Sequence, residues 1–275
     1  MNYIKLEISA ANEALQNIAV ALLSENGYDG FETTENFVYT YIDEDNYSEH
    51  LVKKVLQPFQ LTFTASVIEQ QNWNEVWESN FEPVIVDDFV GVRANFHAPI
   101  QQVQHEIIIT PKMSFGTGHH ATTFTVMQLM QEIDFKNKSV IDFGTGTGIL
   151  AILAEKLGAT EILAIDNDAW CIENSIENIQ TNFCKNIQIK KADTASTEKK
   201  YDIVIANINK NIILDNLVFL HKACKENSTI ILSGLLTSDE KEIIEKTSKF
   251  QWQHITTKEK NNWIALKFIV KTYGV

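Results

Sequence analysis

Apolar and polar residues alternate over the first seventy positions in a pattern that predicts a small α+β domain. Tyr3 to Ile8 alternate like a half-buried strand, and apolar residues between Ala11 and Asn26 recur at helical spacing. The remaining elements are expected to be two strands, a helix and a last strand, at residues 31–34, 37–42, 47–56 and 61–68. This βαββαβ order predicts a ferredoxin-like domain over residues 1–70.

A second pattern begins at Ser139, where short apolar strands alternate with amphipathic helices. Such alternation predicts a parallel, doubly wound α/β sheet. Two further strands, Trp252 to Thr257 and Trp263 to Val270, flank the polar turn Lys258 to Asn262, so the sheet is expected to end in an antiparallel strand. The parallel strands are expected at residues 140–143, 161–165, 187–190, 203–206 and 229–232, with helices beginning near residues 148, 169, 211 and 238.

The segment between the two patterns predicts a connection. Residues 71–83 are expected to form a linker helix that ends at Pro83, with Trp73, Trp77 and Phe81 on one face. We interpret these aromatic residues as packing between the domains; contact with a substrate is the alternative. Short strands are expected at 84–86, 90–94 and 106–110, so the larger domain spans residues 84–275.

A glycine-rich turn follows the first strand of the parallel sheet, in the sequence VIDFGTGTGIL. Gly144, Gly146 and Gly148 would let the backbone turn sharply and approach a ligand. The nicotinamide fingerprint GxGxxG would need its third glycine one residue later, next to a pyrophosphate. Here Asp142 precedes the first glycine by two residues, which disfavours a pyrophosphate and suits an ammonium group. S-adenosylmethionine carries such a group and a cationic sulfonium, so the pattern predicts this cofactor; a purely structural turn is the alternative.

Polar side chains follow the next three strands, at the edge where ligands bind in an open α/β sheet. Asp166 is expected to accept hydrogen bonds from the ribose hydroxyls. Asp193 is expected to accept the adenine amino group, with a turn-capping role as the alternative, and Asp168 is expected to cap the following helix. Asn207 should face the reacting centre, where its carboxamide can orient a neutral amine but cannot act as a base; a turn asparagine is the alternative.

A second glycine-rich segment, PKMSFGTGHHATT, leads into a helix at residues 111–123. Its glycines predict a loop that closes over a bound cofactor and excludes water. His119 and His120 are adjacent, point in different directions on a helix and have no acidic or cysteine partner at ligand spacing, so no metal site is expected. Thr122 and Thr123 are expected to bond either the backbone or the carboxylate of the cofactor.

The composition of the chain says more about its possible partners than about its fold. A net charge of −13 disfavours direct nucleic-acid binding, which needs a basic surface, and is compatible with a basic protein partner; acidity for solubility alone is the other interpretation. No apolar run is long enough to span a bilayer, and the N-terminus lacks the basic start and apolar stretch of a signal peptide. We expect a cytoplasmic protein without a membrane partner, and leave its oligomeric state open with a monomer as the default.

Together, these motifs resemble the ribosomal protein L11 methyltransferase family, bacterial class I S-adenosylmethionine-dependent protein N-methyltransferases. The resemblance covers most of the chain and rests on MSFGTGHHATT, VIDFGTGTGIL, the Asp166 strand tip, AN at Ala206 and Asn207, and SGLL at 233–236. It implies a small N-terminal domain that recognises the substrate and a larger, class I methyltransferase domain that holds S-adenosylmethionine. Thr123, Gly144, Asp166 and Asn207 fall on the family's cofactor-binding positions.

The resemblance also implies the substrate, namely lysine side chains and the N-terminal α-amine of a basic ribosomal protein. The chain departs from the family after Asn207, where Ile208-Asn209-Lys210-Asn211 replaces a small, apolar, proline-containing run. An enzyme acting on nucleic acid, another protein or a small molecule is the alternative, although nucleic-acid and glutamine methyltransferases would be expected to show NPPY at Asn207. A nicotinamide oxidoreductase and a catalytically silent binding module are further alternatives; glycine spacing disfavours the first and the retained cofactor residues disfavour the second.

Overall fold

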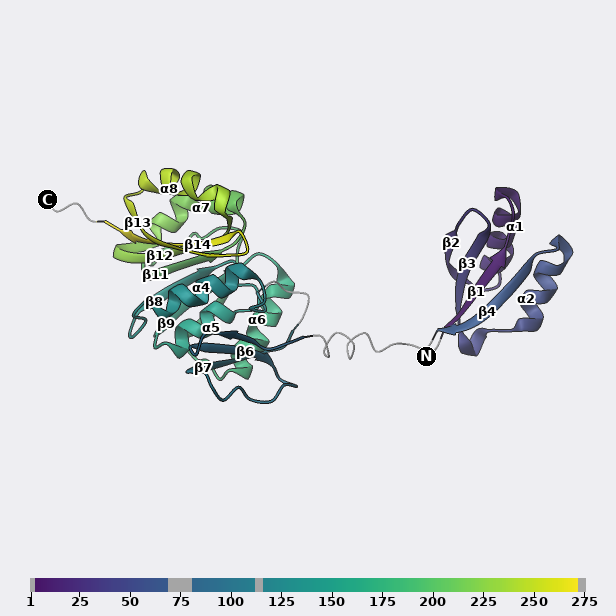
Figure 1. Cartoon of the computed structure of the whole chain (residues 1–275), viewed down its shortest axis with the longest axis horizontal. Helices are drawn as coiled ribbons and strands as arrows, with labels where there is room; N and C mark the ends of the chain where they lie inside the picture. The colour runs from purple at the N-terminus through teal and green to yellow at the C-terminus, as the bar shows by residue number, and fades with distance from the viewer. Residues whose placement is uncertain (1–2, 69–80, 112–115, 272–275) are drawn as a thin grey trace. The chain divides into compact units, whose positions relative to one another are not determined.

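The computed structural model describes residues 3–68, 81–111 and 116–271, which fall into two compact units (Figure 1). The first unit covers residues 1–80 and the second covers residues 81–275. Each unit has a hydrophobic core of its own. Trp73 and Trp77, which are expected on a linker helix, lie outside the described residues.

The first unit is a four-stranded antiparallel sheet with two helices. The strand order β2-β3-β1-β4 is that of a ferredoxin-like sheet, as the βαββαβ pattern predicts. Asn12 and Ser48 begin the two helices because their side chains accept free backbone amides of the first turn. The elements are β1 (Tyr3–Ser9), α1 (Glu13–Ser24), β2 (Asp29–Thr33), β3 (Phe37–Asp43), α2 (Glu49–Leu56) and β4 (Thr62–Ile68), with 3-10 turns at Glu44–Asn46 and Gln57–Phe59.

The two faces of this small sheet differ in what covers them. Successive strand residues point to opposite faces, and Ile4, Leu6 and Ile8 of β1 are buried in one core with α1 and α2. Lys5 and Glu7 of the same strand therefore point to the other face. Both described helices of this unit lie on the side of the buried residues, so neither covers the second face, which we call the open face (Figure 1).

The second unit contains a seven-stranded sheet in the order β10-β9-β8-β11-β12-β14-β13. Neighbouring strands from β10 to β12 run parallel, and β14 runs antiparallel to both of its neighbours. This confirms the doubly wound sheet with an antiparallel final strand. The strands are β8 (Ser139–Phe143), β9 (Glu161–Asp166), β10 (Ile187–Lys191), β11 (Tyr201–Asn207), β12 (Cys224–Leu236), β13 (Trp252–Lys260) and β14 (Trp263–Val270).

Helices cover both faces of the large sheet (Figure 1). One core contains α4 (Ala121–Gln131), α5 (Ile149–Lys156) and α6 (Ala169–Thr181), with a small sheet of β5 (Val84–Val86), β6 (Val90–Ala94) and β7 (His105–Ile109). The other core contains α7 (Lys210–Lys222) and α8 (Glu240–Ser248), the latter after a 3-10 turn at Thr237–Asp239. Because both faces are covered, the carboxyl ends of the parallel strands are the part of the sheet available to a ligand.

Two strands near the C-terminus are longer than the sequence predicts. β13 extends to Lys260, so the expected turn of residues 258–262 is reduced to Asn261 and Asn262, both with positive φ. Two such residues form the tight turn that matches the twist of an antiparallel hairpin, and asparagine tolerates this conformation. β12 also exceeds the expected 229–232, and the register of its pairing with β14 shifts between Ser233 and Leu235. No helix among the described residues is long and apolar enough to cross a membrane.

Candidate active site

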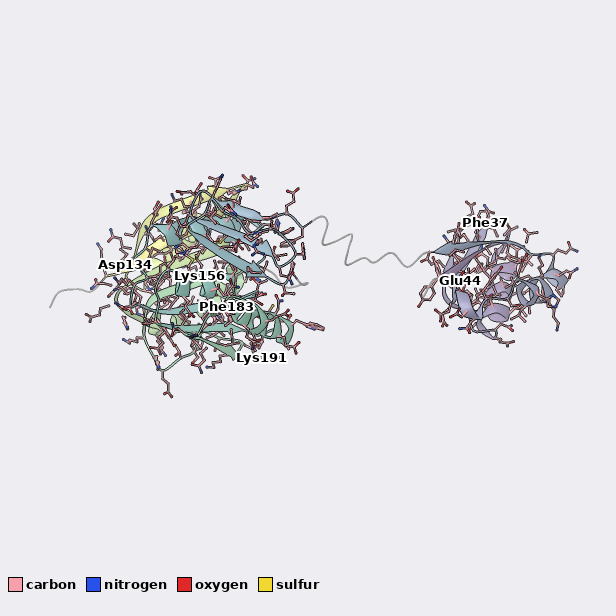
Figure 2. The ribbon with its side chains drawn as sticks, turned by 90° about the horizontal axis from the view of Figure 1, so that it is seen from below. Phe37, Glu44, Asp134, Lys156, Phe183 and Lys191 are labelled. Carbon is pink, nitrogen blue, oxygen red and sulfur yellow. The ribbon has the colours of Figure 1, made fainter. Side chains whose placement is uncertain are left out.

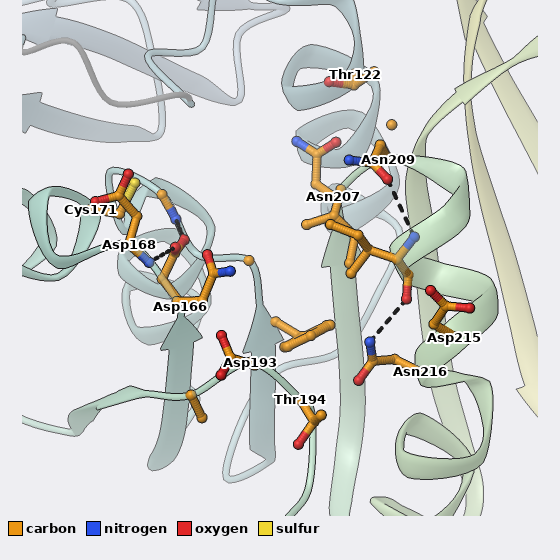
Figure 3. Close-up of a pocket in the computed structure, with 18 of the residues that line it drawn as sticks. Thr122, Asp166, Asp168, Cys171, Asp193, Thr194, Asn207, Asn209, Asp215 and Asn216 are labelled. Atoms are coloured by element: carbon orange, nitrogen blue, oxygen red, sulfur yellow. Dashed lines mark hydrogen bonds between the residues drawn. The ribbon is translucent and has the colours of Figure 1, made fainter.

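A cavity of about 810 Å³ lies at the carboxyl ends of β8, β9, β10 and β11 (Figure 3). This volume is typical of small-molecule sites. All of the residues that line it belong to the second unit. Figure 3 shows Asp166 and Asp168 on one side of the cavity, and Asn207 and Thr122 on the other.

The glycine-rich turn after β8 forms part of the cavity wall. The backbone amides of Gly144 and Thr145 donate to the carbonyl of Ile165 at 2.8 and 2.9 Å, which ties the turn to β9. Gly144 has a φ of +79°, and a Cβ at this position would lie 2.1 Å from Cγ2 of Ile208. Both conformation and space therefore require glycine here. Gly144 and Gly146 line the cavity, whereas Gly148 is not among the lining residues and is the N-cap of α5.

Asp166 ends β9 with its carboxylate at the cavity. Oδ2 accepts the amide of Gly146 at 2.9 Å, and Oδ1 accepts the amide of Asp168 at 3.0 Å. These bonds fix the carboxylate, and each oxygen keeps a lone pair for a further donor. Asp166 thus provides a fixed pair of acceptors at the cavity, and its contact with two ribose hydroxyls stays a prediction. Asp168 caps α6 by accepting the amide of Trp170 at 2.8 Å, as predicted.

Asp142, which the sequence pattern predicts to suit the ammonium group of the cofactor, is buried beside the glycine-rich turn. Its carboxylate is fully buried and accepts the hydroxyl of Thr145 at 2.6 Å, and it is not part of the cavity wall. Burial raises the pKa of Asp142 to about 7; the Thr145 hydrogen bond opposes this shift and the nearby charge of Asp166 adds to it. In this structure the Asp142 carboxylate stabilises the glycine-rich turn through its hydrogen bond with Thr145. Its contact with an ammonium group stays a prediction.

Asn207 ends β11 on the opposite side of the cavity from Asp166 and is only 7% exposed. Its Nδ2 donates to Oγ1 of Thr123 at 3.2 Å. Its Oδ1 has no hydrogen-bond partner among the described residues, and a buried acceptor without a donor is costly. This oxygen is therefore suited to a donor that arrives with a ligand. Thr123 is buried and absent from the cavity wall, so in this structure it positions Asn207, while Thr122 lines the cavity.

The far end of the cavity from Asn207 combines the segment after β10 with α7. Asp193 is exposed and lines the wall there, as the strand-tip position predicts. Asp215 and Asn216 of α7 also line it, and the sequence reasoning missed both. Asn216 ties the two segments together because its Oδ1 accepts the amide of Ala195 at 3.1 Å. No spacing within α7 distinguishes these two side chains from other polar residues of a helix.

The adjacent histidines before α4 point to different neighbours. Nε2 of His119 lies 2.8 Å from the carbonyl oxygen of Glu82, and its ring meets Phe81 edge-on at 4.6 Å. The ring of His120 instead meets Trp263, 4.8 Å away, at the cavity. Phe81, expected to pack between the domains, thus packs within the second unit. In the described part of the glycine loop, Gly116 accepts the hydroxyl of Thr147 at 2.6 Å; closure of this loop over a ligand stays a prediction.

Comparison with known proteins identifies the family. Residues 2–271 match the family described as ribosomal protein L11 methyltransferase (PrmA). The chain belongs to the ribosomal protein L11 methyltransferase family. A ribosomal protein L11 methyltransferase from Phocaeicola vulgatus is 37% identical, over 98% of this chain and 100% of that protein. Another, from Bacteroides thetaiotaomicron, is 36% identical over 94% of this chain and 96% of its own length.

A solved structure supports the same family. The ribosomal protein L11 methylase from Lactobacillus delbrueckii subsp. bulgaricus matches with a TM-score of 0.65 and 28% identity, covering 70% of this chain and all of that chain. S-adenosylmethionine is the cofactor of the ribosomal protein L11 methyltransferase family, and the cavity fits it. A fixed carboxylate at Asp166 suits the ribose, and glycine at position 144 leaves room for a ligand to approach the backbone.

The segment after Asn207, where the sequence departs from that of the family, is fixed by hydrogen bonds and ion pairs. The amide of Ile208 donates to β12 at 3.1 Å. Asn209 caps α7 by accepting the amide of Ile212 at 3.3 Å. Lys210 forms ion pairs with two carboxylates near α8, those of Asp239 at 2.8 Å and Glu242 at 3.2 Å. The departure therefore changes how α7 begins while Asn207 keeps its place at the cavity.

Proposed function

We infer that this chain transfers methyl groups from S-adenosylmethionine to amino groups of ribosomal protein L11. The match to the family over residues 2–271 supports the activity. The buried Oδ1 of Asn207, which has no partner among the described residues, supports this cavity as the place where the methyl group is transferred. The proposed acceptors are lysine side chains and the N-terminal α-amine, and the proposed location is the cytoplasm, where ribosomal proteins are made.

The residues of the site act mainly by positioning. A lysine amine has a pKa of about 10.4 in water and must lose a proton before it can attack carbon. When bound, S-adenosylmethionine supplies a methyl group whose C–S electron pair stays on sulfur while the nitrogen lone pair forms the new N–C bond. Burial in the cavity favours the neutral amine, whose proton is released to bulk water before the amine is enclosed. Oδ1 of Asn207 accepts a remaining N–H and aims the lone pair, and the loop around Gly116 excludes water.

Substrate recognition is assigned to the first domain, residues 1–70, and chemistry to residues 84–275, with 71–83 as the linker. The charge distribution supports this division. The first unit, residues 1–80, contains 13 acidic and 3 basic residues, a net charge of −10, whereas residues 81–275 contain 23 acidic and 20 basic residues, a net charge of −3. A basic ribosomal protein would be attracted mainly to the first unit.

The open face of the small sheet is the surface proposed for this contact. Glu7 pairs across the sheet with Tyr39, and Tyr39 pairs with Glu32, so acidic and aromatic side chains share this face. Figure 2 shows Phe37, at the start of β3, at the surface of the unit. Aromatic rings among carboxylates suit a basic protein surface, because rings provide contact area and carboxylates meet lysine and arginine. The open face is defined by Lys5, Glu7, Glu32, Phe37, Tyr39 and Tyr41.

Methylation of purified ribosomal protein L11 tests the activity directly. The full chain, S-adenosylmethionine and L11 are mixed, and methyl groups on L11 are located by peptide mass spectrometry. We expect methylated lysine or N-terminal peptides that are absent when Asn207→Ala replaces the wild type at the same early time point. Titration with S-adenosylmethionine and with NADH separates this class from an oxidoreductase. Cofactor binding without transfer to L11, but with transfer to RNA or another protein, would contradict the proposed substrate.

A further inference from the structure

Two aromatic side chains meet at the Asn207 end of the cavity. The rings of His120 and Trp263 lie edge to face, with centroids 4.8 Å apart and an interplanar angle of 70°. Both residues line the cavity, as do Thr122 and Asn207. We call this pair the aromatic corner. The proposed function uses neither ring.

The fold holds Trp263 at this place through a tight hairpin and a close strand contact. The turn at Asn261 and Asn262 makes Trp263 the first residue of β14, paired with Lys260. On its other side β14 pairs with β12, whose Gly234 has a φ of +84°. A Cβ on Gly234 would lie 2.0 Å from the carbonyl oxygen of Ile208, so glycine there lets β12 and β14 approach the end of β11.

His120 contributes a neutral ring. Its Nδ1 accepts the amide of Thr122 at 3.3 Å, which caps α4. An acceptor role for Nδ1 leaves the proton of the neutral imidazole on Nε2. Burial lowers the pKa of His120, which further favours the neutral form near pH 7. Because Nδ1 is engaged by Thr122, the part that we assign to this ring at the cavity is contact.

The aromatic corner and the acidic side of the cavity suit different ligand groups. Asp166 and Asp193 provide acceptors for the hydroxyl and amino groups of a nucleoside. An aromatic corner lacks such acceptors, but the face of a tryptophan attracts cations and accepts methyl groups. A lysine amine that already carries one methyl group is both apolar and, when protonated, cationic. Figure 3 shows Asn207 and Thr122 separated from Asp166. His120 precedes Thr122 by two residues and contacts Trp263, so the corner belongs to the Asn207 side.

We propose that the aromatic corner of His120 and Trp263 binds the amine-bearing side chain of the substrate, including its methylated cationic forms, beside Asn207. This assignment rests on the proposed methylation of ribosomal protein L11. The ring of Trp263 supplies the main contact with the amine and its methyl groups. The ring of His120 packs against Trp263 and fixes its orientation. The corner thereby retains a methylated amine for the next transfer.

Trp263→Leu in the full chain tests the corner. With L11 and S-adenosylmethionine, we expect KM for L11 to rise about 2- to 30-fold, the range expected from loss of a cation–π contact. The products should shift from more highly methylated to monomethylated lysine at equal total transfer. The dissociation constant of S-adenosylmethionine should stay within about threefold. Trp263→Phe keeps a weaker aromatic face and should restore part of the product pattern.

Two more variants complete the test. His120→Asn keeps a side chain that can cap α4 but removes the ring, and it should change the products in the same direction as Trp263→Leu and by less. Trp170→Leu, at an exposed tryptophan outside the cavity wall, is the matched control and should behave like the wild type. Wild-type KM and product pattern in both Trp263 variants would contradict the assignment of the aromatic corner to the substrate amine. The proposed function would stay intact. An affinity loss for S-adenosylmethionine that equals the whole activity loss would assign the corner to the cofactor, and no transfer by the wild type would remove the proposed function itself.

Discussion

The two units of this chain differ in where their polar groups lie. The first unit carries most of the net charge and has acidic and aromatic side chains together on an open sheet face, whereas the second is nearly neutral and gathers its acceptors around a cavity. Attraction between proteins acts through exposed charges over about one Debye length, roughly 8–10 Å in physiological salt. Alignment of an amine needs a closed site from which water is excluded. The difference agrees with the proposal that one unit finds the substrate and the other aligns it.

Removing the first unit should have the largest effect. A chain starting at Phe81 keeps the ring that packs on His119 and retains both large cores. We expect it to bind S-adenosylmethionine like the full chain and to lose at least about 100-fold in kcat/KM for L11, because the proposed recognition surface is absent. Calorimetric titration and methyl-transfer assays measure the two quantities. Full activity in this truncation would show that the second unit alone finds its substrate.

Asp166→Ala should weaken the binding of S-adenosylmethionine without weakening the binding of L11. Each hydrogen bond to a charged group contributes about 1.5–3 kcal/mol, so loss of the ribose pair should weaken S-adenosylmethionine binding by roughly ten- to several hundred-fold. Binding of L11 should change little. Asp168→Ser is the matched control because it removes a neighbouring carboxylate and keeps a helix-capping side chain. Unchanged affinity in a folded Asp166→Ala variant would contradict the ribose assignment.

Asn207→Ala should act on transfer more than on cofactor binding. We expect the single-turnover rate to fall about 10- to 100-fold, because misalignment of the amine costs rate directly, and cofactor affinity to fall less than in Asp166→Ala. Asn207→Asp adds a negative charge that raises the pKa of the bound amine and keeps its lone pair occupied. Its rate should therefore be low near pH 7 and recover partly as pH rises. Wild-type rates in both variants would exclude Asn207 from the transfer step.

The sequence predicts the elements and the strand-tip residues of the second unit because these signals are local. Hydrophobic runs mark β8 and β9, and the motif DxGxGxG places glycines directly after β8. Asp166 and Asn207 end their strands, so the parallel sheet brings them to one edge. Elements of the first unit are equally local, and its βαββαβ order is enough to predict the sheet order.

Features that depend on contacts between distant segments could not be predicted in the same way. His120 and Trp263 meet only because α4 packs on the antiparallel end of the large sheet and a two-residue turn sets the start of β14. The motif also fixes the position of Asp142 without fixing which side of the turn its carboxylate faces. That side is decided by the hydroxyl of Thr145 and the packing behind the turn.

Charge reversal on the open face should test whether this face contacts L11, with a smaller effect than removal of the first unit. Glu7→Lys and Glu32→Lys each change the net charge by two on the proposed contact surface, and we expect KM for L11 to rise about 2- to 10-fold in low salt. The increase should shrink as salt is added, because exposed charges are screened. Glu25→Lys makes the same change of net charge at the end of α1, on the helical side. Equal effects from all three would indicate general attraction without a defined contact face.

Asp142→Asn should change function least, because the carboxylate lies outside the cavity wall. We expect the affinity for S-adenosylmethionine to stay within about threefold, whereas a loss of tenfold or more would place the carboxylate on the ammonium group after all. Stability gives an independent readout. Burial raises the pKa of Asp142 from 3.8 to about 7, so between these values the folded state binds more protons than the unfolded state. The free energy of unfolding contributed by this group therefore falls as pH rises from about 4 to 7 and is constant above. Asn cannot ionise, so the variant should gain stability relative to the wild type across this window, reaching a difference on the order of a few kcal/mol by pH 8 in urea titrations.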